Sequence, residues 1–234
     1  HPELLDYLAS RLAEDQWSLK QLVRELVLSR TYRQSSASTE NSSADPDNVW
    51  WGRAERKRLP AESIRDGMLA ASDELTFQRV DPPAKRENDY NFRYQGTARS
   101  VFIPMYRNSI PEILLAFDFP SPSMSVGKRN ASIVAPQGLF LMNSSFVMDR
   151  AEELADLAVR KTNHFADAFR LAMLRTIGRA PTAEELVFAE SLIAEPSTAQ
   201  ATISESPKTP AATARDLTPL VHALLASPEF RYLD

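Results

Sequence analysis

"SLKQLVRELV", Ser18–Val27, is the stretch that decides the fold class. Ser18 can cap a helix, and Gln21 follows three residues later, which is the pattern of a capping box. The apolar residues behind this start recur every three or four positions, at Leu19, Leu22, Val23, Leu26 and Val27. That spacing predicts an amphipathic helix with one buried face.

The same helical signals recur before and after this segment. Leucines at helical spacing predict a helix over residues 4–12, and Thr182 with Glu185 forms a second capping box. Asp45-Pro46 predicts a helix that would carry Trp50 and Trp51, and further helices should follow Pro60 and Pro111. The remaining predicted helices cover residues 137–142, 146–160, 164–177 and 214–226, the last with a late start or a kink at Pro219.

Strand signals are confined to one place. "SVFIPMY", Ser100–Tyr106, is the best strand candidate, and Pro104 restricts it to an edge or to an extended segment. The predicted fold is therefore mainly α: an irregular multi-helix domain with long polar loops and at most a minor extended or β segment near residues 100–106. We expect a single domain over residues 1–234, with a flexible, Pro-, Ser-, Thr- and Ala-rich loop at 195–211.

Composition excludes several classes of site. The 234 residues carry a net charge of −4 and a pI of about 5.5, which disfavours a nucleic-acid binder. The absence of cysteine excludes disulfides, thiolate metal ligands and covalent haem attachment within this chain, so we expect no cofactor here. No apolar run approaches the roughly 18 residues of a membrane span. The start at His1-Pro2 suggests a fragment of a longer polypeptide.

No catalytic signature is recognisable, so the sequence leaves open whether the protein is an enzyme. His1, His164 and His222 lack partners at metal-ligand spacing. No nucleophile-elbow or phosphate-loop motif is present. The basic run "RAERKR" at 53–58 is interpreted as a solvated helix face. Glu62 and Asp66, which share a helix face, could hold Arg58 or an arginine from another loop in an ion-pair network.

A long irregular stretch, "FDFPSPSMSVGKRNASIVAPQ" (117–137), holds the best remaining candidates. Loops of this length are usually functional or disordered. Arginine can bind an anion, or it can tie a loop down through a carboxylate and backbone carbonyls, and we favour the second role. We therefore predict an ordered cover over the helical core, with Arg129 pinned to an acceptor such as Asp118. The candidate ligand-binding residues in and around it are Arg107, Asp118, Arg129, Gln137 and Asn143.

Seven short motifs, in order, resemble one known family. They are "HPELLDYLA" (1–9), "LVLSRTYRQSS" (26–36), "RLPAESIRDG" (58–67), "RSVFIPMYRNSIPEILLAFDFPSP" (99–122), "GLFLMNSSFV" (138–147), "GRAPTAEE" (178–185) and "LVHALLASPEF" (220–230). Together they are similar to the C-terminal domain of unknown function (family 1553) of planctomycete cytochrome-c-domain-containing proteins. The five candidate residues match the pattern of that family at their motifs.

The resemblance implies a context rather than an activity. It implies a large, exported (periplasmic or secreted) multidomain protein, with a further domain upstream and often a cytochrome-c-like domain before that. Our main hypothesis is a non-catalytic structural or interaction module that packs against those upstream domains. The alternative is a binding or hydrolytic domain for an anionic or carbohydrate ligand, built on the Arg/Asp cluster around residues 107–143, with Trp50, Trp51 or Tyr106 as stacking surfaces.

Overall fold

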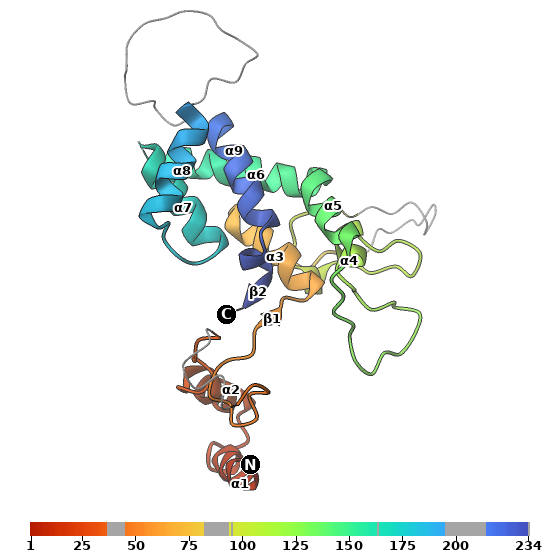
Figure 1. The fold of residues 1–234 in the computed structure, drawn as a ribbon. Helices are drawn as coiled ribbons and strands as arrows, with labels where there is room; N and C mark the ends of the chain where they lie inside the picture. Colours follow the sequence, from red (N-terminus) through yellow and green to blue (C-terminus); the bar gives the residue numbers. More distant parts are fainter. Residues whose placement is uncertain (37–44, 82–93, 95, 163, 195–213, 234) are drawn as a thin grey trace, which may run out of the picture. The chain divides into compact units, whose positions relative to one another are not determined.

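The computed structural model describes residues 1–36, 45–81, 94, 96–162, 164–194 and 214–233. The protein is mainly helical, as predicted (Figure 1). Within the described ranges no helix is both long and apolar enough to cross a membrane. The chain divides into two compact units, one made of His1–Lys57 with Tyr232–Asp234 and the other of Arg58–Arg231. The single domain over 1–234 stays a prediction, and the flexible loop expected at 195–211 lies outside the described residues.

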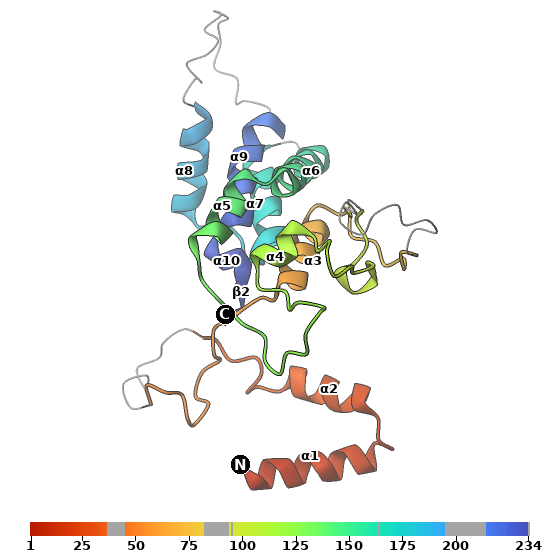
Figure 2. The same ribbon diagram turned by 90° about the vertical axis from the view of Figure 1, so that its right-hand side faces the viewer.

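The first unit begins with a helical hairpin of α1 (Pro2–Glu14) and α2 (Leu19–Leu28), which lie side by side in Figure 2. The turn between them bends through positive φ angles at Gln16 and Trp17. Ser18 caps α2 as predicted, because its hydroxyl accepts a hydrogen bond from the backbone N–H of Gln21 at 3.4 Å.

The segment after the hairpin corrects two predictions. No helix carries Trp50 and Trp51, since the chain turns there, with positive φ angles at Asn48 and Trp51. A helix cannot continue through such residues. The basic run 53–58 is also not helical. It ends in the short strand β1 (Lys57–Arg58), which pairs with β2 (Tyr232–Leu233).

The second unit holds the hydrophobic core. Its helices are α3 (Ala61–Ala71), α4 (Glu112–Ala116), α5 (Ala135–Asn143), α6 (Ser145–Lys161), α7 (Phe165–Thr176), α8 (Ala183–Ala194), α9 (Ala214–Ala226) and α10 (Pro228–Arg231). The long helix α6 packs against α7 and α9, and α3 packs against α4, α6 and α7. Leu154, Leu217 and Val221 are completely buried between them. The helix predicted over 214–226 is confirmed as α9, and because it begins at Ala214 with Pro219 inside it, the alternative of a late start is excluded.

The predicted strand over 100–106 does not form. Ser100–Phe102 is a turn of 3-10 helix, Ile103 after it has an extended backbone, and Tyr106 forms an isolated antiparallel bridge with Ser109. The backbone N–H of Ser100 donates to the Asp66 carboxylate of α3 at 2.8 Å. Pro104 has no N–H to offer a neighbouring strand. The segment is held by the Asp66 side chain of α3 and by a backbone hydrogen bond from the Val80 N–H to the Phe102 carbonyl, not by a continuous strand ladder.

Candidate functional site

The candidate site is the long segment between α4 and α5, which is irregular from residue 117 to residue 134. Its central residues, 121–131, are all exposed. The loop therefore projects into solvent, and the predicted cover over the helical core was wrong. What the prediction did identify is the set of polar contacts at the base of the loop, where the chain leaves α4 and returns to α5.

Asp118 is the centre of these contacts, and it joins the two ends of the loop. One carboxylate oxygen accepts a hydrogen bond from the backbone N–H of Ser132 at 2.8 Å, and the other accepts from the Ser132 hydroxyl at 2.7 Å. Gln137, at the start of α5, donates to the Ser132 carbonyl at 3.1 Å. We call Arg58, Asp118, Ser132 and Gln137 the loop clasp.

Arg58 supplies the positive charge of the loop clasp. Its guanidinium lies 2.7 Å from the Asp118 carboxylate and also donates to the Ser132 carbonyl. The Arg58 side chain is only 7% exposed, so this ion pair is largely shielded from water. Burial alone would raise the pKa of Asp118, but the hydrogen bonds from Arg58 and Ser132 outweigh it and hold the pKa below its ordinary value.

Arg129 does not bind Asp118, so the predicted pairing was wrong. Its guanidinium contacts both oxygens of Glu62 on α3, at 2.7 and 2.9 Å, and lies over the ring of Phe119. The Arg129 side chain is 53% exposed. The network predicted for Glu62 therefore does hold a loop arginine, whereas Arg58 is held by Asp118.

The other predicted residues lie apart from one another. In the loop clasp Gln137 is buried and Asp118 is half-buried, whereas Asn143 is exposed and donates to the Leu139 carbonyl of its own helix. Arg107 is exposed and makes no hydrogen bond or ion pair with a described residue. The structure thus brings together Asp118 and Gln137 of the five, and their role in ligand binding stays a prediction.

Sequence reasoning did not pair Arg58 with Asp118, and it missed Ser132. The Arg58–Asp118 contact joins residues 60 positions apart, and Ser132 has no feature that distinguishes it from the other loop serines. One local signal was available. Asp118 has a positive φ, which suits Asp better than most residues and marks a sharp turn at the start of the loop.

A second polar cluster surrounds Arg65, which is 3% exposed. Its guanidinium donates to the backbone carbonyls of Gly96 and Ala98, at 2.7 and 2.8 Å, and lies near the carboxylate of Asp66. Burial lowers the pKa of Arg65, and the negative charge of Asp66 opposes this shift. These bonds hold the segment before the 3-10 helix against α3, so this arginine also serves the fold.

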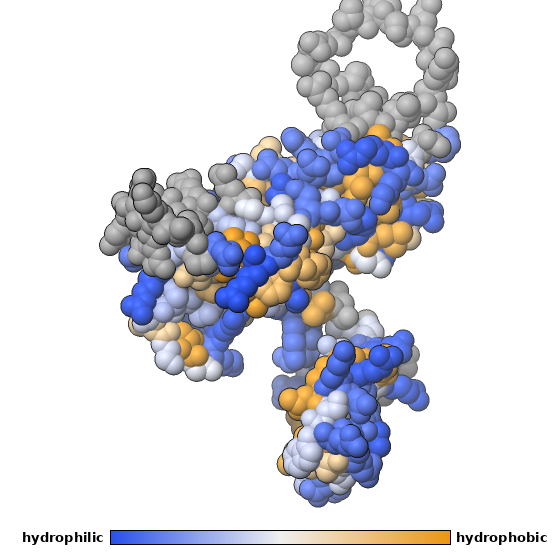
Figure 3. All heavy atoms as spheres, turned by 180° about the vertical axis from the view of Figure 1, so that it is seen from behind, coloured by the Kyte–Doolittle hydropathy of each residue, from blue (hydrophilic) through white to orange (hydrophobic). Residues whose placement is uncertain are grey.

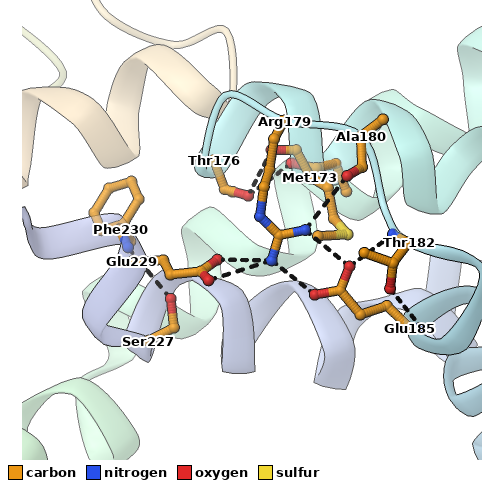
Figure 4. A network of polar contacts seen from close by, with 10 residues as sticks. Met173, Thr176, Arg179, Ala180, Thr182, Glu185, Ser227, Glu229 and Phe230 are labelled. Atoms are coloured by element: carbon orange, nitrogen blue, oxygen red, sulfur yellow. Dashed lines mark hydrogen bonds and ion pairs between the residues drawn. The ribbon is translucent and has the colours of Figure 1, made fainter. Parts of the chain in front are cut away.

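A third cluster joins three elements at the start of α8 (Figure 4). The Arg179 guanidinium contacts Glu185 at 2.7 Å and Glu229 of α10 at 3.0 Å. Glu185 also accepts from the Thr182 backbone N–H, and Thr182 accepts from the Glu185 N–H, which confirms the predicted capping box. The hydrogen bond from Arg179 lowers the pKa of Glu185 to about 2.

Metal ligands do not gather in the described part of the chain. No group of three or more His, Asp or Glu residues there could hold an ion. His222 is used elsewhere, since its Nε2 lies 2.8 Å from the Leu141 carbonyl. The carbonyl can only accept, so Nε2 carries the proton in this contact. The arginines of the three clusters, Arg58, Arg65 and Arg179, thus contact other parts of the fold.

The comparisons with known proteins give one match. The family described as "Protein of unknown function (DUF1553)" matches residues 1–193 of the chain. No curated protein and no solved structure matches it.

Proposed function

The chain belongs to the DUF1553 family of proteins of unknown function, and we propose that it is a non-catalytic interaction module. Its exposed surfaces support this proposal. The observation that supports it is the helical hairpin of the first unit. No residue of α1 or α2 is buried, although both helices are strongly amphipathic. A surface helix of this kind normally packs its apolar face against a core.

Both helices of the hairpin expose large apolar side chains. Leu5 of α1 is 69% exposed, and Leu19 and Val23 of α2 are exposed to a similar degree. Helical geometry places Leu19, Val23 and Leu26 on one side of α2. Figure 3 shows apolar side chains among the surface residues of the protein. An exposed face of this kind marks a protein interaction site.

Polar side chains join the two helices where α1 meets α2. Glu25 accepts a hydrogen bond from the Tyr7 hydroxyl at 2.7 Å and one from Arg11 at 3.3 Å. These contacts join α1 to α2, where Leu8, Leu12 and Leu22 are half-buried and no residue is fully buried. Ion pairs this close to solvent contribute at most about 1 kcal/mol. The hairpin thus has a defined shape without a core of its own.

A partner would supply that core. None of the described residues of the first unit is buried, and a unit of this size needs a buried core, disulfides or a partner to be stable. We propose that the partner is a preceding domain of the same polypeptide. The resemblance to cytochrome-c-domain proteins supports this choice. It also supports the further proposal of an exported, haem-associated multidomain protein.

The alternative, a site for an anionic or carbohydrate ligand, gains no support from the positions of its residues. Arg129 is engaged by Glu62, Asp118 by Arg58, and Arg107 lies away from both pairs. A binding site needs polar groups that converge on one space. We therefore retain one proposed function.

Hydrogen exchange of the whole gene product, compared with residues 1–234 alone, tests the proposal. We expect the amides of α1 and α2 to exchange fast in the isolated chain. They should be strongly protected in the longer polypeptide, because the apolar face is covered there. Equal exchange in the two proteins would contradict the proposal.

Two variants of the longer polypeptide sharpen the experiment. Val23→Glu introduces a charge on the apolar face and should abolish the added protection. Arg24→Glu, at the next position of α2, introduces the same side chain off the apolar stripe and should leave the protection in place. Loss of protection in both variants would show general unfolding of α2 rather than a lost interface.

A further inference from the structure

Helix α5 has an exposed face that is apolar and carries no charge. Leu139 is 61% exposed and Met142 is 65% exposed, and Ile133 just before the helix is 78% exposed. Charged residues make up 25% of the chain, yet residues 130–148 contain none. A helix that is apolar on all sides normally lies inside a protein. An outer face of this composition therefore points to a contact with another molecule.

The exposed residues of α5 lie on one side of the helix. Ala135, Leu139 and Met142 follow one another at spacings of four and three residues, which places them along one stripe. Helix α5 packs against α4, α6 and α9 through its other side, where Gln137 is buried. We call Ala135, Gly138, Leu139 and Met142 the α5 stripe.

Gly138 in the middle of the α5 stripe has no role in the packing of its own chain. Glycine inside a helix is destabilising relative to alanine. Gly138 does not have a positive φ, and a Cβ there would meet no atom within 4 Å. By contrast, a Cβ at Gly67 would lie 3.3 Å from the Phe230 ring. Gly138 therefore leaves a hollow on the outside of α5, where a second helix can approach closely.

The composition of this segment favours a protein partner over a lipid surface. Helices that lie on a membrane carry lysine and arginine beside the apolar face, and tryptophan or tyrosine at its edges. Residues 130–148 contain none of these four residue types. The centre of a protein interface is instead depleted of charge and enriched in methionine. The segment has both features, since Met142 and Met148 are exposed.

The absence of charge selects a second copy of the chain among protein partners. The α5 stripe offers no side chain to pair with a partner's charge, and a buried charge without a pair is costly. The partner's contact surface must therefore be uncharged as well. A two-fold contact places a surface against itself, and the α5 stripe meets the requirement because no like charges then approach each other.

Other exposed apolar faces of the chain do not meet this requirement. On α2, Lys20 stands three residues before the exposed Val23 and shares its side of the helix. On α8, Glu184 stands four residues before the exposed Phe188 in the same way. A two-fold contact through either face would bring like charges together.

We propose that α5 of one copy packs antiparallel across α5 of a second copy, with a two-fold axis between Gly138 and Leu139. The hollows at Gly138 face each other, so the two backbones come close there. Met142 of each copy lies against Ala135 of the other, because the two residues are equally far from the axis. One helix from each copy makes the whole contact. It goes beyond the interface proposed for the hairpin, which involves α1 and α2.

The dimer is weak. A standard interface buries about 800 Å² on each partner, and smaller interfaces belong to transient complexes. The α5 stripe with the flanking Ile133 and Val134 provides less than that area. The experiment must therefore detect a position-specific contact in a small fraction of the molecules.

Single-cysteine cross-linking tests the proposal, since the chain has no cysteine of its own. In the Leu139→Cys variant the thiols of two copies lie beside the axis, and mild oxidation with copper phenanthroline should link them. Val187→Cys is the matched control, because Val187 on α8 is exposed to a similar degree. The Leu139→Cys chain should link about tenfold faster, since the contact raises the effective concentration of its thiols. Equal rates would mean random collision and would overturn the proposal.

The antiparallel register gives an independent result. In a mixture, Met142→Cys should link to Ala135→Cys several-fold faster than to a second Met142→Cys chain. The axis places position 142 of one copy against position 135 of the other, whereas the two positions 142 lie at opposite ends of the contact. A Met142→Cys chain that links to itself just as fast would contradict the proposed axis.

Filling the hollow separates the contact from the stability of the monomer. Gly138→Leu, added to the Leu139→Cys chain, should slow linking about tenfold because the backbones can no longer approach. The monomer should be at least as stable by circular dichroism, since leucine favours a helix more than glycine does. Linking that is unchanged by Gly138→Leu would refute the close approach. A parent chain that sediments with phosphatidylcholine–phosphatidylglycerol vesicles, without position-specific linking, would assign the face to lipid and overturn the dimer. None of these results affects the interface proposed for α1 and α2.

Discussion

Arg58 and Arg129 both hold the loop between α4 and α5, and they differ in how far water reaches them. Arg58 lies in the loop clasp and is shielded, whereas Arg129 contacts Glu62 at the surface. Removing one partner of an ion pair costs more as water is excluded, because the charge that is left behind is poorly solvated. The two arginines should therefore respond very differently to the same substitution.

We predict that Arg58→Ala lowers the free energy of unfolding by about 3 kcal/mol, since it leaves the Asp118 carboxylate partly buried without its partner. Arg129→Ala should lower it by about 0–1 kcal/mol, as for an exposed pair. Denaturant unfolding of the variants measures both. Arg107→Ala is the control and should be neutral, and a loss in Arg129→Ala as large as that in Arg58→Ala would contradict the prediction.

Glu185 makes stability depend on pH. Its pKa is about 2 in the folded protein, below the ordinary value of 4.5. The unfolded chain therefore binds a proton more readily than the folded one. The stabilising contribution is fully present above about pH 4.5 and is lost as the pH falls toward 2. Screening by solvent makes this contribution to stability small, because both Glu185 and Arg179 are partly exposed.

Glu185→Gln should accordingly destabilise the protein at pH 7 and have little effect near pH 2. Urea unfolding at several pH values between these limits measures the difference from the parent chain. Glu184→Gln, at the neighbouring exposed position in the same first turn of α8, should show no such pH-dependent difference. A Glu185→Gln penalty that is constant with pH would argue against the ion pair.

At the scale of the element, local sequence signals predicted the helices well. Capping at Ser18 and Thr182 and the spacing of the apolar residues depend on neighbours within four positions, so they can be read from the chain. The loop from Asp45 to Arg53 is held by hydrogen bonds between its own polar side chains and its backbone. Asp45-Pro46 is also a pattern that begins helices, so the sequence predicted a helix at this position.

Contacts between helices far apart in the sequence could not be predicted from such local signals. A glycine inside a helix, such as Gly67 in α3, by itself only weakens the helix. In the structure a Cβ at Gly67 would lie 3.3 Å from the ring of Phe230, so the glycine allows α10 to approach α3 closely. The loop clasp likewise joins the β1 arginine to residues far along the sequence. Such pairings depend on the tertiary fold, which periodicity does not specify.

The C-terminal end of α3 has a cap from another helix. Arg175 of α7 donates to the Ala71 carbonyl at 2.8 Å and contacts Asp73 at 2.8 Å. The last carbonyls of a helix lack partners within it, and a cation there is favourable. Arg175 therefore joins α7 to the end of α3.

We predict that Arg175→Met lowers the free energy of unfolding by about 1–2 kcal/mol, since it removes hydrogen bonds to a charged group at a helix end. Arg170→Met, on the same helix but exposed, is the matched control and should be neutral within about 0.5 kcal/mol. Thermal or denaturant unfolding of both variants checks the prediction. Equal stability of the two variants would contradict the capping role.

At the scale of the whole molecule, apolar burial is distributed unevenly between the two units. Every buried hydrophobic residue in the described ranges lies between Ala61 and Phe230, in the second unit. The described residues of the first unit contribute none, although its two helices are well formed. Helical stability in proteins comes mainly from the packing of an amphipathic face rather than from propensity. The two units should therefore differ in stability within one chain.

Hydrogen exchange of residues 1–234 should show this difference directly. We predict that amides of α6 and α9, whose apolar faces are buried against each other, exchange only through global unfolding. Amides of α1 and α2 should exchange faster by several orders of magnitude, since opening the hairpin exposes little additional apolar surface. Val23→Glu should not change the fast rate in the isolated chain, whereas Leu154→Ala in α6 should accelerate exchange in α6 and α9 together. Equal protection of α1 and α6 would mean that the hairpin is covered within the chain itself, and the interface proposed for its apolar face would then have no surface left to bind.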